Sequence, residues 1–235
     1  AELGEIDILV NNAGMSQAMS LEKTDDAIWQ TDIDLKLMAA VRLCQAVIPA
    51  MRDRGDGRIV NITNTGGKAA RPGGIPTSVT RAAGLNLTKA LAGEYAGDNV
   101  RVNSICIGLV KSGQWERRAA AEGADLDQYY EEVGERVPLG RVGEAEEFAD
   151  LVAFLVSDRA AYITGAAINF DGGIDDIPAY LTGWLGATCM EMEDPRVLKY
   201  GISPTVWIVF GITNERTPWM YTCVPGMDVH GFDIK

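Results

Sequence analysis

The sequence predicts an α/β protein with a doubly wound parallel sheet, covered by helices on both faces. Short runs that are apolar on both faces alternate with longer segments of helical periodicity. Each apolar run is followed by turn-forming residues such as glycine, asparagine or aspartate, as expected where a strand enters a turn. Strands without a polar face belong to sheets covered on both sides, and strand–helix alternation favours right-handed crossovers between parallel strands.

The first predicted elements are a strand at residues 8–10 and a long helix at residues 26–53. The strand is a short apolar run, predicted to be fully buried, that stops at the turn formers of residues 11–14. Apolar residues recur at helical spacing in the second segment up to Gly55, namely Met38, Val41, Cys44, Ile48 and Met51.

The same alternation continues to residue 173. The remaining predicted elements are strands at 58–63, 100–106 and 167–170, helices at 77–96 and 144–157, a glycine- and proline-bearing loop at 64–76, and a long loop with polar helical segments at 108–143. Sheets of this class bind ligands beyond the carboxyl ends of their strands. The turns after Val10, Ile62 and Cys106 should therefore line any site.

Composition and charge exclude several classes of function. The chain has 21 Lys and Arg against 33 Asp and Glu, a formal charge of −12 that repels nucleic-acid phosphates and anionic membrane surfaces. No apolar run reaches the roughly 18 residues of a membrane span. Four widely spaced cysteines and a lone His230 do not predict a metal site. Cys44 and Cys106 lie in apolar segments, which indicates reduced thiols and a cytoplasmic protein.

Four runs of the chain resemble the short-chain dehydrogenase/reductase family in order and in spacing. They are DILVNNAG at 7–14, GRIVNIT at 57–63, VRVNSICIGLVKS at 100–112 and YITGAAINFDGG at 162–173. In the third run, Ile107 stands where the family usually has proline. The resemblance covers residues 1–174 and implies a Rossmann-like domain there, without the family's first βαβ unit. Residues 175–235 are then a C-terminal extension.

The resemblance implies NAD or NADP as the cofactor. Family position assigns it these residues: Asn11, Ala13, Gly14, Ile62, Gly108, Val110 and Ser112. The first three would face the ribose, where small residues let the backbone approach closely, and the others would face the nicotinamide. The family's glycine-rich phosphate loop belongs to the first βαβ unit, and no GxxxGxG or GxGxxG occurs among the 26 glycines. We therefore expect these 235 residues to bind the dinucleotide weakly.

The family's four catalytic positions carry other residues in this chain. They are Asp34 for the asparagine, Asn64 for the serine, Thr77 for the tyrosine and Arg81 for the lysine, and no tyrosine has Lys or Arg four residues later. A phenol with a pKa near about 10 can share a proton with a substrate, whereas the Thr77 hydroxyl is too weak an acid. Arg81 can still bind a ribose, and Asn64 can still donate to a carbonyl oxygen.

The extension at 175–235 is rich in aromatic residues. It holds eight of the 17 aromatic residues in the chain, and such side chains favour burial against the same subunit or across an interface. Its patterns predict a helix at 177–190 and a strand at 206–212.

These observations favour a catalytically degenerate member of the family that partners an active NAD(P)-dependent dehydrogenase. The helices at 26–53 and 77–96 correspond to those through which the family forms homo- or hetero-oligomers. One alternative is an NAD(P)-dependent oxidoreductase of alcohols or ketones with an unrecognised proton donor. Another is a non-catalytic module that binds a small-molecule ligand in the retained pocket.

Overall fold

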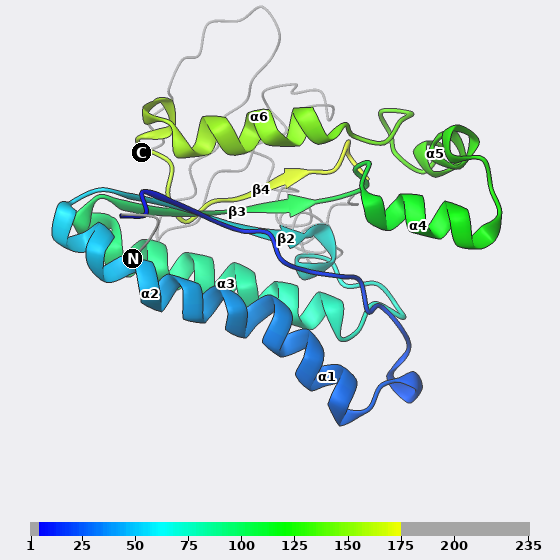
Figure 1. Cartoon of the computed structure of the whole chain (residues 1–235), viewed down its shortest axis with the longest axis horizontal. Coiled ribbons are helices and arrows are strands. Elements are labelled where there is room, and N and C mark those ends of the chain that lie inside the picture. The colour runs from blue at the N-terminus through cyan, green and yellow to red at the C-terminus, as the bar shows by residue number, and fades with distance from the viewer. Residues whose placement is uncertain (1–4, 175–235) are drawn as a thin grey trace, which may run out of the picture. The chain divides into compact units, whose positions relative to one another are not determined.

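The computed structural model describes residues 5–174, which form a parallel four-stranded sheet. The strands follow one another in the order β1 (Ile8–Asn11), β2 (Gly57–Asn64), β3 (Val100–Ile107) and β4 (Ala167–Phe170). In the central register, Ile105 of β3 lies beside Ile62 of β2 and Ile168 of β4. The arrowheads of β2, β3 and β4 all point toward the end of the sheet where α4 lies (Figure 1).

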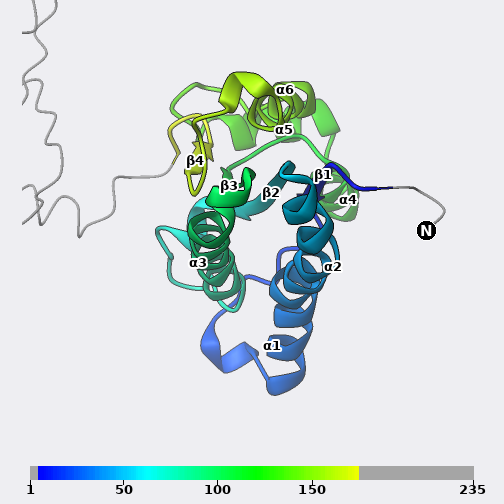
Figure 2. The same cartoon turned by 90° about the vertical axis from the view of Figure 1, so that its left-hand side faces the viewer.

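Helices cover both faces of this sheet, as the sequence predicts. On one face, α2 and α3 lie side by side, and α6 covers the other face (Figure 2). The helix bounds are α1 Asp26–Ile33, a π-helical segment η2 Asp34–Met38, α2 Ala39–Arg54, α3 Thr77–Tyr95, α4 Gly113–Glu122, α5 Leu126–Gly134 and α6 Ala145–Val156. Short 3-10 turns are η1 Leu21–Lys23, η3 Thr65–Gly67, η4 Ala96–Asp98 and η5 Asp158–Ala160.

Alternate residues of the strands fill two separate cores. Ile59, Val100 and Val102 pack against α2 and α3, in a cluster that includes the fully buried Met51. Val60 and Ile105 face the opposite way and pack against α6. Successive side chains of a strand point to opposite faces, so a strand between two helical layers has apolar residues on both faces. This is the reason that periodicity alone predicts the class. The buried polar residues of these strands, such as Asn61 and Ser104, have hydrogen-bond partners.

The prediction of a fully buried first strand is wrong. Ile8 is 46% exposed and Val10 is 39% exposed. Within residues 5–174, β1 pairs only with β2 and forms an edge of the sheet, so one side of the strand has no neighbour. The apolar composition of a strand indicates that it prefers burial, and it does not reveal which strand lies at an edge.

The other predicted elements agree with the structure within about two residues at most boundaries. The polar helical segments expected in the 108–143 loop are α4 and α5. The predicted helix at 177–190 and strand at 206–212 lie outside the described residues. Within residues 5–174, no helix combines the length and the apolar character that a membrane crossing requires.

We predict that Glu147 stabilises α6 in a pH-dependent way. Its carboxylate pairs with Arg141 and accepts the Glu144 backbone N–H, and these bonds lower its pKa from 4.5 to about 2. A carboxyl whose pKa is lowered on folding stabilises the protein above its unfolded pKa, and this contribution is lost as the pH falls toward the folded value. In urea denaturation, Glu147→Gln should be less stable than wild type at pH 7, and the gap should narrow between pH 5 and pH 3. Glu146→Gln is the matched control, and a gap that does not depend on pH would contradict the pairing.

Candidate functional site

The candidate site lies at the carboxyl edge of the sheet, where the turns after β1, β2 and β3 meet. Because these strands are parallel, their ends open on the same edge (Figure 1). The turn after β1 contains Ala13 and Gly14, β2 ends at Asn64, and the loop after β3 starts at Gly108. The N-terminal turns of α3 add Thr77 and Arg81.

Arg81 ties the turn after β1 to the end of β2. Its Nη1 donates to the Ile62 carbonyl oxygen at 2.6 Å. Its Nη2 lies so close to Gly14 that a side chain there would collide with the guanidinium. Burial lowers the pKa of Arg81, and the charge of Asp32 opposes that shift. The Arg81 Nε is buried without a hydrogen-bond partner in the described chain, so this side chain retains a donor for a further acceptor.

Asn11 and Asn64 use their side chains for internal hydrogen bonds. The Asn11 side-chain NH₂ donates to the Asn61 side-chain oxygen Oδ1 at 2.7 Å. The Asn64 carbonyl oxygen accepts the Gly67 backbone N–H at 3.1 Å and begins η3. Within residues 5–174 the Asn64 NH₂ group makes no hydrogen bond, so it can donate to a ligand.

The family positions after β3 form a separate part of the site. Gly108 approaches Asp171 so closely that a Cβ would lie 2.6 Å from the Asp171 Cβ. Val110 is buried and pairs with Gly143. The Ser112 backbone N–H donates to the Tyr130 hydroxyl at 3.3 Å. These contacts hold the loop from β3 to α4 against Asp171 after β4, against Gly143 before α6, and against Tyr130 of α5.

Thr77, at the family's tyrosine position, is buried and accepts two hydrogen bonds. The residue is 6% exposed. The Lys36 ammonium donates to its hydroxyl oxygen at 2.9 Å, and the Gln17 backbone N–H donates at 3.0 Å. A hydroxyl oxygen has two lone pairs and one hydrogen. Both lone pairs are therefore used, and the hydroxyl hydrogen is the part of Thr77 that remains for a third partner.

Lys36 is the member of this site that sequence reasoning missed. Its side chain and that of Asp32 are both fully buried and form an ion pair. The other Asp32 oxygen accepts the Thr80 hydroxyl at 2.5 Å. Burial lowers the pKa of Lys36, the hydrogen bond and charge of Asp32 oppose that shift, and the charge of Arg81 adds to it.

A π-helical segment directs Lys36 inward. The Ala39 N–H bonds to the Asp34 carbonyl, five residues back, which widens one turn of the long helix. Buried positions recur every four residues along it, at Asp32, Lys36, Ala40, Cys44 and Ile48. A regular helix of 3.6 residues per turn would rotate such a row steadily off the buried face, and one wider turn reduces that drift.

Asp34, the residue predicted for the family's asparagine position, does not join this cluster. Its side chain is 44% exposed and accepts hydrogen bonds from Gln30 at 2.9 Å and Arg42 at 3.2 Å. The hydrogen bond from Gln30 is the main cause of its lowered pKa. The signal in the sequence that could have pointed to Lys36 is its place as a lone charge among Leu35, Leu37 and Met38, four residues after Asp32.

No group of His, Cys, Asp and Glu residues suited to a metal ion occurs in the described part of the chain. The site is instead a basic and hydroxyl-bearing cluster, with Lys36 and Arg81 as its cations and Asp32 as its anion. Such a cluster can hold hydroxyl and carbonyl oxygens and can exchange a proton with them.

We predict that the buried Asp32–Lys36 pair adds little to the free energy of unfolding when it is compared with two apolar residues at the same positions. Lys36→Met alone leaves the Asp32 carboxylate buried without its cation, which should cost about 3–5 kcal/mol in urea denaturation at pH 7. The double variant Asp32→Leu with Lys36→Met should regain at least about 2 kcal/mol. Arg42→Met, which breaks the exposed pair with Asp34, should cost less than about 1 kcal/mol. A double variant as unstable as the single one would show that the pair itself stabilises the fold.

Comparison with known proteins identifies the family. The family model described as enoyl-(acyl carrier protein) reductase matches residues 1–175. An acetoacetyl-CoA reductase of Rhizobium meliloti is 40% identical over 173 residues, which cover 74% of this chain and 69% of the relative.

Solved structures agree with this result. An NADPH-bound short-chain oxidoreductase of Pseudomonas aeruginosa PAO1, described as containing an atypical catalytic center, is 37% identical with a TM-score of 0.69, over 74% of this chain and 68% of that one. L-sorbose reductase of Gluconobacter frateurii, complexed with NADPH and L-sorbose, is 36% identical with a TM-score of 0.68, over the same shares of the two chains. The four motifs, the parallel sheet and these matches together show that the chain belongs to the short-chain dehydrogenase/reductase family.

Proposed function

We propose that this chain forms the nicotinamide- and substrate-binding part of an NADP(H)-dependent oxidoreductase of a small ketone or secondary alcohol. One observation carries the proposal: Arg81 joins the Ile62 carbonyl to the Gly14 turn and keeps its Nε without a partner. This is the position of the lysine that holds the nicotinamide ribose in the resembling family. A buried guanidinium with an unused donor suits the hydroxyl oxygens of a ribose.

The residues present fit the nicotinamide half of the cofactor. Gly14 and Gly108 have no room for a Cβ, because Arg81 packs against the first and Asp171 against the second. Arg81 would hold the ribose, and the loop that contains Val110 and Ser112 would face the nicotinamide. When bound, the reduced cofactor supplies a hydride to the carbonyl carbon. The Pseudomonas and Gluconobacter structures contain NADPH, which supports NADPH over NADH as the cofactor proposed here.

The substrate class follows from the donors beside this position and from the relatives. The Asn64 NH₂ group and the Thr77 hydroxyl hydrogen are both available to a carbonyl oxygen. The relatives include an acetoacetyl-CoA reductase and a reductase of L-sorbose. Each name indicates reduction of a ketone, which supports a ketone as the substrate here.

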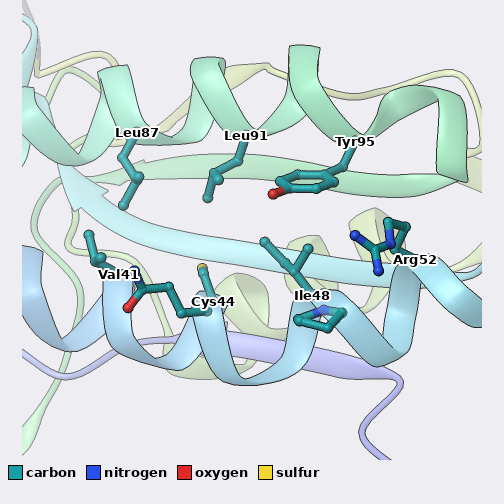
Figure 3. A pocket seen from close by; sticks show the side chains of 9 residues that line it. Val41, Cys44, Ile48, Arg52, Leu87, Leu91 and Tyr95 are labelled. Carbon is teal, nitrogen blue, oxygen red and sulfur yellow. The ribbon is translucent and has the colours of Figure 1, made fainter.

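The second candidate function is a catalytically degenerate subunit that partners an active dehydrogenase of the family. Two observations favour it: Thr77 stands at the tyrosine position, and the groove between α2 and α3 is lined mostly by apolar side chains, with Gln45 and Arg52 among them. A groove lies between these helices, where Leu87, Leu91 and Tyr95 of α3 point toward α2 (Figure 3). The family resemblance assigns subunit pairing to this face, so pairing could persist without catalysis.

We predict that Arg81 binds the nicotinamide-side ribose. Arg81→Met should weaken binding of NADPH at least about tenfold by titration calorimetry, as expected for a hydrogen bond from a charged donor. It should weaken binding of reduced nicotinamide mononucleotide by the same factor, because that fragment contains the ribose in question. Arg42→Met, on the exposed side of α2, is the control. Equal affinities of Arg81→Met and wild type for both ligands would overturn the proposed binding site.

Activity before and after restoration of the family residues separates the two candidate functions. The oxidoreductase proposal predicts that the unaltered protein oxidises NADPH with acetoacetyl-CoA or ethyl acetoacetate as the ketone probe. The degenerate-subunit candidate predicts activity only after Thr77→Tyr is combined with Arg81→Lys, since those changes supply the phenol and the lysine. NADPH consumption at 340 nm is the measurement, and the native mass of the same sample shows whether the chain pairs.

A further inference from the structure

We propose that Lys36 supplies the proton for carbonyl reduction and that the Thr77 hydroxyl passes it to the substrate oxygen. The Lys36–Thr77 pair would then replace the tyrosine phenol of the family. This inference rests on the proposed oxidoreductase function. Lys36 lies at none of the four family positions assigned from the sequence, and its role follows from its contacts alone.

The first support is the geometry around the Thr77 oxygen. Lys36 and Gln17 both donate to it, which leaves its own hydrogen as the group that can bond to a ligand. Ser78 Oγ and Gln17 Oε1 are also buried without a partner within residues 5–174. Ser78 follows Thr77 in the sequence, and the Gln17 backbone N–H donates to the Thr77 hydroxyl. Buried polar atoms without partners are rare, and several together indicate a polar ligand position.

The second support is that the Lys36 ammonium allows the Thr77 hydroxyl, which is a very weak acid, to donate a proton. An isolated threonine hydroxyl cannot release a proton near neutral pH, because an alkoxide would form. Here the ammonium touches the hydroxyl oxygen, so the proton that leaves Thr77 is replaced from Lys36 in the same event. No free alkoxide has to accumulate, and the acidity that governs the transfer is that of Lys36.

The third support is that Lys36 is held in position and has an altered acidity. Asp32 binds the ammonium, and the Thr80 hydroxyl orients Asp32 through its other oxygen. The charged groups that face Lys36 are Asp32 from α1 and Arg81 from α3. Burial and Arg81 lower the pKa of Lys36 and make proton release easier, whereas Asp32 opposes that shift.

A purely structural explanation of the pair is weaker on energetic grounds. Two charges that are fully buried lose their hydration, and apolar residues of similar size often stabilise a core equally well. The pair also adjoins the π-helical segment, and such segments occur frequently at functional sites. The Asp32–Lys36 pair lies beside Thr77 although its burial costs the hydration of both charges, which is consistent with a chemical role.

The proposed step balances in atoms and charge. The carbonyl carbon gains a hydride from the reduced cofactor, and the carbonyl oxygen gains the Thr77 hydroxyl proton. Thr77 regains a proton from the Lys36 ammonium, which becomes a neutral amine. After the alcohol leaves, Lys36 takes a proton from water and its charge is restored. Alcohol oxidation follows the same path in reverse.

Tyr130 is the rival proton donor. Its hydroxyl accepts the Ser112 N–H, and the Lys111 ammonium lies 5.5 Å from the centre of its ring. A phenol is a stronger acid than a threonine hydroxyl. Tyr130, however, lies on α5 with its hydroxyl engaged at Ser112, and no hydrogen bond in the described chain links it to Thr77 or Arg81. The variant Tyr130→Phe tests this rival directly.

The first experiment measures single-turnover hydride transfer from NADPH to acetoacetyl-CoA by stopped flow. Thr77→Val removes the hydroxyl, and Lys36→Arg keeps a cation for Asp32 that does not release its proton. Each variant should slow transfer at least about 100-fold, the contribution typical of general acid catalysis. NADPH affinity should remain within about threefold of wild type, and Thr77→Ser should restore most of the rate.

Matched variants control for the fold and for the rival donor. Thr88→Val removes another buried hydroxyl of α3 that bonds to Asn61, and Tyr130→Phe removes the rival phenol. Thr88→Val should transfer hydride at the wild-type rate. Tyr130→Phe also removes the acceptor of the Ser112 N–H, and its rate should stay well above that of Thr77→Val. If Lys36→Arg disrupts the fold, Asp32→Leu with Lys36→Met removes both charges and should show the same loss of rate. A slow Tyr130→Phe beside a fast Thr77→Val would overturn the relay.

The second experiment follows the ionisation of Lys36 without turnover. Nitrogen-15 NMR of labelled lysine should show one resonance, absent in Lys36→Arg, that titrates below the ordinary lysine value of 10.5. Thr77→Val removes an acceptor of the ammonium and should move this titration to lower pH. The rate of reduction should fall as the pH rises through the same midpoint.

The possible outcomes separate the two levels of the proposal. An unaltered protein that binds NADPH yet reduces neither acetoacetyl-CoA nor ethyl acetoacetate overturns the oxidoreductase function, and the relay with it. An active protein in which Lys36→Arg is equally fast overturns the relay alone. A Lys36 resonance that does not titrate across the pH range in which the rate changes also overturns the relay alone.

Discussion

A parallel sheet covered on both faces leaves few places for chemistry, and this constraint determines where the site lies. The apolar side chains of β2 and β3 pack in two cores, one against α2 and α3 and one against α6. The buried polar ones, such as Asn61, Thr63 and Ser104, hydrogen-bond within the protein. Ligands can therefore reach the backbone only at the edge where the strands end. Gly14, Asn64 and Gly108 lie there because each follows or ends a strand, and α3 places Thr77 and Arg81 beside them.

Buried charge then determines what the edge can do. In the resembling family, a phenol and a lysine share the task of proton transfer and ribose binding. In this chain Arg81 stands at the position that the resemblance gives to the lysine, and the ammonium of Lys36 donates to Thr77, which stands at the position given to the tyrosine. The positive charges of Lys36 and Arg81 adjoin the carboxylate of Asp32, so the cluster has one unit of net positive charge in a chain whose formal net charge is −12. Loss of the tyrosine therefore does not remove every proton donor from the site.

The fold was predictable from the sequence, whereas the central pair of the site was not. Both faces of the central strands carry apolar residues, namely Ile59 and Val102 on one face and Val60 and Ile105 on the other. The composition of these strands therefore indicates a sheet that is covered on both sides. The sequence did not predict that Lys36 is buried in the site, because helical periodicity describes a regular helix. The wider turn at η2 changes which residues face inward. Within residues 5–174 β1 has one neighbouring strand, and the exposure of Ile8 and Val10 depends on which strands lie beside it and not on local residue preference.

The most direct test is a crystal structure of the protein with NADP⁺ and acetoacetyl-CoA. We predict that the β-keto oxygen lies within about 2.5–3.0 Å of the Thr77 hydroxyl, the range of a hydrogen bond between oxygens. The Lys36 ammonium should remain bonded to the same hydroxyl, and a ribose oxygen should meet Arg81. A keto oxygen that contacts Tyr130 instead, or that lies beyond hydrogen-bond distance of Thr77, would contradict the proposed relay.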